Sequence, residues 1–232
     1  MADAILLAAN LPGTQKLAER VARASDTKLD IPDGAFWIPS VGGRRLEESL
    51  DWDPAENDDG TVDSMSVGDD IYVYVVPRTD TGRRCKLIAS KNAAGPDGYA
   101  DDEYVRIAGY HYGKWRALSD AYDSSAPAQT GIIPNSVWDV LNRPTCDPSG
   151  MAEIIEGSAW LDIYLASDDG QAWPDTRAES RHDATPVSGS DGYNLYYDYL
   201  RLLRNAGKRM PQPGEWIVGA YGVPQGATDA GG

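Results

Sequence analysis

Residues 130–165 constrain the fold of this chain most, because they combine a dense apolar load with prolines that interrupt any long regular element. Pro134 and Pro144 interrupt this apolar segment. The apolar residues of the first part are Ile132, Ile133, Val137, Trp138, Val140 and Leu141. The stretch contains no set of nucleophile, base or metal ligands. We therefore interpret it as scaffold.

A turn and a strand follow within the same stretch. Pro148 and Gly150 supply the fixed φ and the permissive φ that a tight reversal at residues 146–150 needs. Residues 160–165 alternate as in a half-buried strand. Leu161, Ile163 and Leu165 fall on one side of it, and Trp160, Asp162 and Tyr164 on the other.

The first half of the chain is predicted to be mainly β. Residues 71–76 form the clearest strand, and residues 85–90 are predicted to return beside it after a hairpin-like connection. Residues 104–112 indicate another strand, in which Gly109 marks a bulge. Residues 36–39 give a brief strand closed by proline. This half supplies the β part of an α+β fold.

Three helices complete the expected α+β fold. Residues 15–24 show a short amphipathic pattern, with apolar residues on one face and charged residues outside. Residues 195–204 form the strongest helix candidate, with a broad apolar face, arginines in the last turn and Gly207 after the end. Pro213 opens another short helix, which runs to about residue 221.

The chain is strongly acidic, with 36 Asp and Glu residues against 21 Lys and Arg and a net charge of −15. This charge argues against a nucleic-acid partner, which requires a basic surface, and against an anionic membrane. Its simplest consequence is solubility. No apolar run is long enough to span a bilayer, so we expect no membrane insertion. The 13 Tyr and 7 Trp, against one Phe, fit either a contact surface or sheet residues that face partly to water.

The N-terminus and the cysteines bear on where the chain is made. Residues 1–9 lack the basic start and the apolar length of a signal peptide, so we expect synthesis and folding in a cytoplasm. Cys85 and Cys146 are too few for a disulfide framework. We expect both to be small buried or half-buried side chains, and a bridge between them stays open.

A calcium loop is the sharpest hypothesis for the acid-rich residues 47–70, but its spacing fails. With Gly60 as the turn glycine, the first ligand position falls on Ala55 and the last on Ser66, where a bidentate Glu is needed. We therefore interpret these residues as a solvated loop.

Motifs for catalysis are also absent. His111 and His182 lack zinc-ligand spacing with the cysteines or with acidic residues. No nucleophile elbow, phosphate-binding loop, zinc-protease motif or dinucleotide fingerprint occurs, although a serine paired with one histidine stays open. Glu215 beside Trp216 is either a buried acid or, more simply, a carboxylate near a helix start. We therefore assign no catalytic residue, no metal ligand and no cofactor.

Several short motifs occur in the order found in a known family. They are residues 132–139 (IIPNSVWD), 142–144 (NRP), 150–151 (GM), 160–165 (WLDIYL), 202–211 (LLRNAGKRMP), 215–216 (EW) and 220–226 (AYGVPQG), with weaker matches at 71–76, 86–90, 96–99 and 106–111. Together they resemble phage tail-fibre and receptor-binding proteins with a C-type-lectin-like domain, the family of the major tropism determinant. The resemblance covers residues 70–226.

The resemblance implies a β-rich N-terminal domain at residues 1–115, for attachment or oligomerisation, and a C-type-lectin-like domain at residues 116–232. Lectin-like domains of this family usually continue into a tryptophan- and glycine-rich segment that carries the ligand-facing residues, whereas this chain ends at Gly232. We therefore expect a partial lectin frame, and the receptor-binding residues are unknown. The frame also resembles formylglycine-generating enzymes, but Cys85 and Cys146 do not match their catalytic cysteines.

The function that the resemblance implies is adhesion without catalysis. The chain would be a homotrimeric virion protein of the tail tip or fibre, with other virion proteins and a host cell-surface molecule as partners. The alternative is a purely structural virion component, such as a baseplate or capsid-decorating protein. In both cases we expect Trp138, Trp160 and Trp216 to lie over one shared interior.

Overall fold

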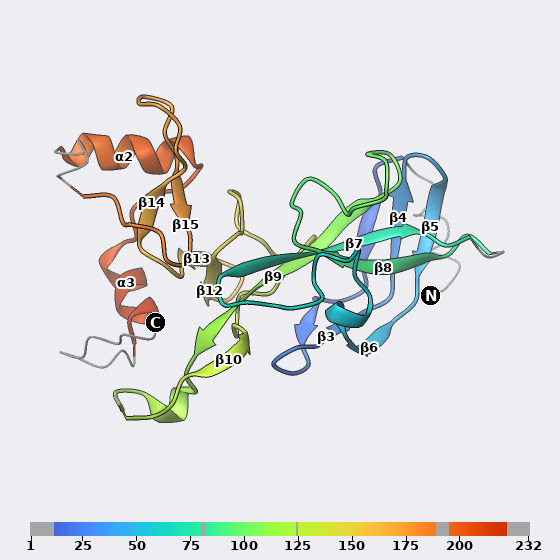
Figure 1. The fold of residues 1–232 in the computed structure, drawn as a ribbon, viewed down its shortest axis with the longest axis horizontal. Coiled ribbons are helices and arrows are strands. Elements are labelled where there is room, and N and C mark those ends of the chain that lie inside the picture. Colours follow the sequence, from blue (N-terminus) through green and yellow to red (C-terminus); the bar gives the residue numbers. More distant parts are fainter. Residues whose placement is uncertain (1–11, 80–81, 124, 189–194, 222–232) are drawn as a thin grey trace. The chain divides into compact units, whose positions relative to one another are not determined.

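The computed structural model describes residues 12–79, 82–123, 125–188 and 195–221. Most regular structure in these residues is β, and the two α-helices among them lie late in the chain (Figure 1). The expected α+β class therefore holds only in the coarser form of a mainly β chain with few helices. Residues 1–9, on which the signal-peptide argument rests, lie outside the described part.

The chain divides into two units, and the scaffold stretch at residues 130–165 contributes to both. The first unit comprises Met1–Gly113 and Gly131–Arg143. The second unit comprises Lys114–Thr130 and Pro144–Gly232. Each unit has strands and a core of its own.

A five-stranded sheet dominates the first unit. Its strands follow the order β10 (Gln129–Ile132), β9 (Val105–Trp115), β7 (Asp69–Pro77) and β8 (Cys85–Ser90), and β11 (Trp138–Asp139) also pairs with β9. The strand β7 pairs antiparallel with both β8 and β9. The three long strands β7, β8 and β9 correspond to the strands predicted at residues 71–76, 85–90 and 104–112, and these predictions are confirmed.

Two three-stranded sheets complete the first unit. One has the order β1 (Gln15–Leu17), β4 (Gly34–Ile38) and β5 (Gly42–Leu46), and the other β2 (Ala22–Arg23), β3 (Leu29–Ile31) and β6 (Ser49–Trp52). The 3-10 turn η1 (Pro54–Glu56) follows β6. The brief strand predicted before Pro39 is confirmed as β4.

The helix predicted at residues 15–24 is wrong, because this segment forms β1 and β2. Leu17, which lies opposite Gly34 of β4, is buried, and so is Val21. An isolated helix of ten residues is marginal in water, so its amphipathic pattern decides little. Pairing with β4 and burial of both apolar side chains outweigh the helical propensity.

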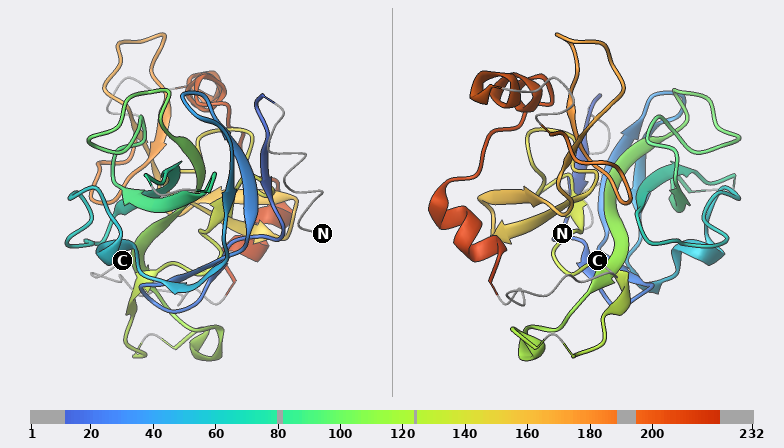
Figure 2. Two further views of the ribbon diagram at one scale, coloured as in Figure 1. Left: turned by 90° about the vertical axis from the view of Figure 1, so that its right-hand side faces the viewer. Right: turned by 60° about the vertical axis from the view of Figure 1, so that its left-hand side comes forward.

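The core of the first unit lies between its sheets. Its buried members include Leu17, Leu29, Ile31, Phe36, Ile38, Leu46, Trp52, Val62, Ile71, Val73, Val75, Leu87, Ile107, Tyr110 and Ile132. In Figure 2 the blue strands of the N-terminal part run beside the green strands of the five-stranded sheet. Tyr72 and Tyr74, on the other face of β7, are buried as well, so the central strand is covered on both faces.

A close approach of two strands explains Gly109. Trp138 of β11 lies opposite Gly109 of β9, and a Cβ atom at Gly109 would lie 2.5 Å from the indole ring and 2.8 Å from the carbonyl oxygen of Ile71. The bulge predicted at Gly109 lies instead at Ile107, where the pairing with β7 shifts. Gly109 is therefore needed for ring packing against the backbone.

A buried carboxylate fixes the end of β11. The side chain of Asp139 is 1% exposed, and it accepts hydrogen bonds from the backbone amides of Val21 at 2.7 Å, Leu141 at 2.7 Å and Asn142 at 2.9 Å. Amide donors compensate the loss of hydration of a buried charge. Asp139 therefore links Val21, between β1 and β2, to the turn that follows β11.

Two hairpins and two helices form the second unit. The hairpins pair β12 (Met151–Ile155) with β13 (Ala159–Asp162) and β14 (Ala166–Asp168) with β15 (Ala178–Ser180). The helices are α2 (Tyr196–Asn205) and α3 (Pro213–Gly219), and the short η2 (Leu118–Asp120) precedes them. Both late helices are confirmed, and Gly207 has the positive φ of 71° expected after a helix end.

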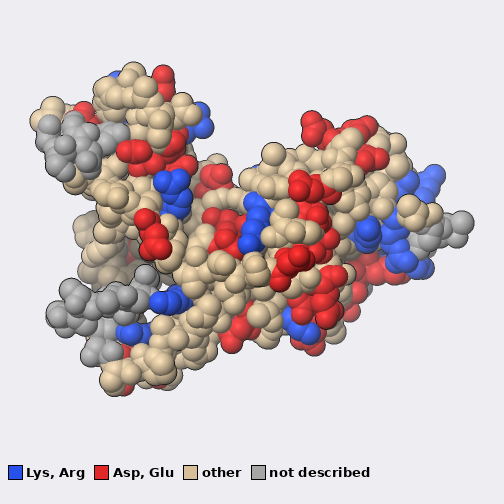
Figure 3. Space-filling model, in the orientation of Figure 1, with Lys and Arg blue, Asp and Glu red and all other residues tan. Residues whose placement is uncertain are grey.

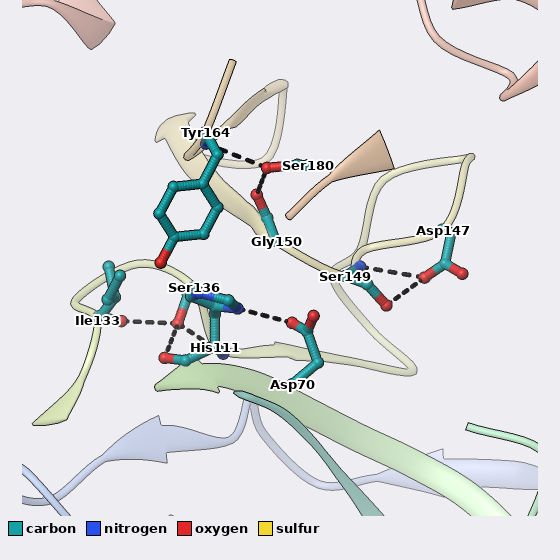
Figure 4. Close-up of polar contacts among 9 residues, drawn as sticks. All are labelled: Asp70, His111, Ile133, Ser136, Asp147, Ser149, Gly150, Tyr164 and Ser180. Atoms are coloured by element: carbon teal, nitrogen blue, oxygen red, sulfur yellow. Dashed lines mark hydrogen bonds and ion pairs between the residues drawn. The ribbon is translucent and has the colours of Figure 1, made fainter. Parts of the chain in front are cut away.

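The strand predicted at residues 160–165 ends early, at Asp162. The backbone amide of Ile163 donates to the carbonyl oxygen of Gly150, and that of Tyr164 donates to the Ser180 hydroxyl. The same hydroxyl donates to the Gly150 carbonyl at 2.6 Å (Figure 4). These contacts take the chain out of the hairpin, and Leu165 is consequently exposed.

The prediction that three tryptophans share one interior is wrong. Trp138 is 3% exposed and belongs to the first unit, whereas Trp160 and Trp216 belong to the second. The side chain of Trp216 is 54% exposed. It therefore contributes to a surface instead of a core.

Replacement of Asp139 by alanine should lower the free energy of unfolding by about 3 kcal/mol, because it leaves three amides without their buried acceptor. The control is Asp63→Ala, at an exposed position, which should change stability by less than about 0.5 kcal/mol. Urea unfolding followed by tryptophan fluorescence measures both. Equal stability of the two variants would contradict the assigned function of Asp139.

Replacement of Gly109 by alanine should destabilise the protein by about 2 kcal/mol, since the new methyl group overlaps the Trp138 ring and the Ile71 carbonyl. Gly214→Ala is the matched control. Nothing lies within 4 Å of a Cβ atom there, and alanine favours a helix, so stability should stay constant or rise slightly. Thermal unfolding of the two variants tests the difference.

Candidate functional site

Most of the exposed large apolar side chains among the described residues belong to the second unit. Nine of them lie on or beside its two helices and define two surfaces. The α3 surface consists of Tyr122, Trp216, Ile217, Val218 and Tyr221, and the α2 surface of Trp173, Leu195, Tyr196 and Tyr197. Exposed apolar groups gathered in this way mark contact surfaces in soluble proteins.

The α3 surface results from how the helix is attached. A Cβ atom on Gly219 would lie 2.5 Å from the side chain of Leu161 in β13, so α3 approaches the hairpin through a residue without a side chain. Ile217, two positions before Gly219 and on the opposite side of the helix, is 68% exposed, and Trp216 is 54% exposed. The rings of Tyr122 and Tyr221 meet edge to face at 5.6 Å.

The tyrosines of the α2 surface lie in the first turn of α2, before the buried Leu202. Leu202 is buried against Ala178 of β15, and Tyr197 is 75% exposed. The guanidinium of Arg201 lies 5.3 Å from the centre of the Trp173 ring. Aromatic rings with a polar edge, next to arginine, are the residue types enriched at protein interfaces.

Sequence reasoning noted the excess of Tyr and Trp but missed both surfaces. The available signal at α3 was the run Trp216, Ile217 and Val218. Three consecutive residues of a helix point in different directions, so they cannot all be buried on one face. At α2 the signal was Tyr196 and Tyr197, which precede the buried Leu202 by six and five positions.

In the first unit the side chain of His111 contacts a carboxylate, whereas that of Ser136 contacts backbone groups. His111 is buried, and its Nδ1 lies 2.9 Å from Oδ1 of Asp70, its cross-strand neighbour (Figure 4). The Ser136 hydroxyl donates to the Ile133 carbonyl at 2.8 Å and accepts from the His111 amide. Ser136 thus supports the backbone. His182 belongs to the second unit, beside the Tyr164 ring.

The acidic residues before β7 act as turn formers. Asp58 accepts from the Val62 amide at 2.6 Å, and Asp59 accepts from both the amide and the hydroxyl of Thr61. Burial opposes ionisation of Asp59, but the hydrogen bonds from Thr61 and Ser90 prevail and lower its pKa. The described residues contain no group of three His, Cys, Asp or Glu side chains arranged to hold a metal ion.

The two cysteines are free thiols, as small buried and half-buried side chains. Burial raises the pKa of Cys85 to about 12. Burial also raises the pKa of the half-buried Cys146, against the opposing charge of Lys208. Thiols with raised pKa values are poor nucleophiles at neutral pH.

Glu215 is the carboxylate of a helix start. It accepts from the amide of Gln212 at 2.7 Å and from both terminal nitrogens of Arg209, at 2.5 and 2.7 Å. The hydrogen bonds from Arg209, followed by that from Gln212, lower the pKa of Glu215 to about 2. The simpler of the two sequence interpretations is thus the right one.

The anchoring of Glu215 predicts a pH dependence of the first turn of α3. Because the folded pKa is about 2 and the ordinary value is 4.5, the contacts of Glu215 persist through the interval between these values and are lost as the pH falls through 2. An NMR titration of the Glu215 carboxyl group measures this. Arg209→Gln should move the midpoint toward 4.5, whereas Arg204→Gln, on α2, should not. A wild-type midpoint near 4.5 would refute the assignment.

Comparison with known proteins places these surfaces in context. The family model described as Mtd second domain matches residues 21–139, which is more than half of the chain. The tail fiber receptor-binding protein of Bordetella phage BPP-1 is 29% identical over 194 residues, which are 74% of this chain and 46% of the relative. The chain thus spans about half the length of this relative.

Solved structures agree on the fold. The Major Tropism Determinant P3c variant superposes with a TM-score of 0.66 at 23% identity, over 89% of this chain and 54% of that chain. The U1 variant superposes with a TM-score of 0.67 at 23% identity, over 96% and 57%. Within the described residues, no helix has the length and apolar character needed to cross a bilayer. The match over residues 21–139 shows that the chain belongs to the family defined by the Mtd second domain.

Proposed function

We propose that this chain is a phage virion protein of the tail fibre or tail tip that takes part in binding the host receptor. The observation that carries the proposal is its membership of the Mtd second-domain family. A relative at 29% identity is itself named a tail fiber receptor-binding protein. The chain would be made in the host cytoplasm and then assembled into the virion.

The proposed mechanism is adhesion by display. The β-rich N-terminal part, residues 1–115, would serve attachment and oligomerisation, and residues 116–232 would form a C-type-lectin-like part that presents the α2 and α3 surfaces. Tyrosine and tryptophan bury a large area with few rotatable bonds, which suits a rigid contact. A homotrimer would multiply weak single contacts.

Binding without catalysis is part of this proposal. The backbone contacts of Ser136 and the raised pKa values of Cys85 and Cys146 support it, because none of these groups is prepared as a nucleophile. The proposed partners are a host cell-surface molecule and other virion proteins, with no nucleic acid, no membrane insertion and no cofactor.

A purely structural virion component is the second candidate. The exposed α3 surface supports this candidate as well as it supports adhesion, because an apolar helix face also suits a permanent contact with a neighbouring virion chain. The two candidates differ in what the isolated chain does to host cells.

Purified chain should compete with intact phage for host cells in an adsorption assay. Tyr197→Ala combined with Trp216→Ala should raise the concentration for half-inhibition at least about tenfold, because exposed aromatic residues dominate contact energies. Leu50→Ala combined with Leu141→Ala, which removes exposed apolar groups from the first unit, is the matched control and should leave it unchanged. Failure of the wild-type chain to compete rules out adhesion, and loss of virion assembly in the aromatic variant then supports the structural role.

A further inference from the structure

Basic residues gather at one end of the first unit, although the whole chain has a net charge of −15. This basic end consists of Arg44, Arg45, Arg78, Arg83, Arg84 and Lys86. Figure 3 shows basic side chains at the end of the first unit that carries the β7–β8 connection, and mostly acidic side chains over the adjoining part of the same unit. This end therefore carries mainly basic charge on a chain that is acidic as a whole.

Backbone contacts bring the members of the basic end together from three segments. The amide of Arg45 in β5 donates to the carbonyl of Arg83 at 2.9 Å, and Arg45 also forms a bridge with Arg84. The amide of Arg78 donates to the carbonyl of Arg84 at 3.1 Å. The concentration of charge is thus a property of the fold, and not of one run of sequence.

Holding like charges at neighbouring positions costs stability. Arg84 forms an ion pair with Glu47 at 3.4 Å, and both side chains are about half exposed, where such pairs contribute little. Arg83 also has a φ of +47°, a conformation that residues other than glycine rarely adopt. A basic cluster on a chain with 36 acidic residues is suited to an electrostatic contact with an anionic partner.

The chemistry of the basic end favours a flexible polyanion over a protein surface. Arg78, Arg83, Arg84 and Lys86 are exposed, and the large exposed apolar residue at this end is Val41, whose carbonyl accepts from Arg44. Protein interfaces are centred on buried apolar anchors, which this end lacks. Guanidinium groups instead bind carboxylate and phosphate groups in a bidentate manner.

We propose that the basic end binds an anionic polysaccharide of the host cell surface through its carboxylate or phosphate groups. This inference rests on the proposed adhesive function and adds a second contact to it, in a different unit from the α2 and α3 surfaces. The acidic remainder of the chain repels a polyanion, so one basic end binds weakly and several copies act together. Binding also weakens as salt screens the charges.

The test measures retention of the purified chain on immobilised alginate, a polymer of carboxylate-bearing sugars, with neutral dextran as the reference. The wild-type chain should bind alginate but not dextran, and should elute as salt rises. Arg83→Glu combined with Arg84→Glu should lower the affinity at least about tenfold. Arg143→Glu combined with Arg181→Glu, which changes the net charge equally at exposed positions elsewhere, should bind as the wild type does.

Other outcomes overturn the inference. Equal binding of the two double variants shows that the basic end is not the site. Tighter binding of a DNA oligonucleotide than of alginate shows a nucleic-acid surface, and a change of association state in light scattering without loss of alginate binding shows a contact between copies. If the variant with Arg83→Glu and Arg84→Glu competes for host cells at the same concentration as the wild type, adhesion is retained and the polysaccharide contact is rejected. The two proposals can therefore fail separately.

Discussion

The first unit depends on one carboxyl group that is buried away from water and hydrogen-bonded to backbone amides. Asp139 is buried, and the amides of Val21, Leu141 and Asn142 replace its hydration. Val21 is 118 positions away in the sequence, so the carboxylate joins the beginning of the unit to its last strand. Beside it, Trp138 covers Gly109 at a distance that no other residue at that position allows. Together they position β11 on β9.

The three long strands of the five-stranded sheet, β7, β8 and β9, were predictable because each is rich in apolar residues and has a turn at its end. The helix α2 was predictable because Gly207 ends a clear apolar pattern. The segment at residues 15–24 was not, since its strand character comes from pairing with β4, which no local pattern encodes. The end of β13 at Asp162 was hidden for a similar reason: the partners of Ile163 and Tyr164 are Gly150 and Ser180.

The surfaces were harder to predict than the core. Composition indicated a contact surface through its Tyr and Trp content, but the place where α3 meets the hairpin depends on the contact between Gly219 and Leu161, which joins distant segments. The net charge of the chain likewise gave no indication of the basic end. A value of −15 for the whole chain conceals the basic end, because Arg45, Arg78 and Arg84 are brought together by backbone hydrogen bonds and bridges between separate strands.

The attachment of α3 through Gly219 has an evolutionary consequence. Gly219 lies against Leu161 where any side chain would clash, whereas the side chains of Trp216, Ile217 and Val218 are about half exposed or more. A substitution at these three positions should therefore disturb the hairpin less than a substitution of Gly219 does. The helix thereby combines one position that admits only glycine with neighbouring positions that tolerate more variation.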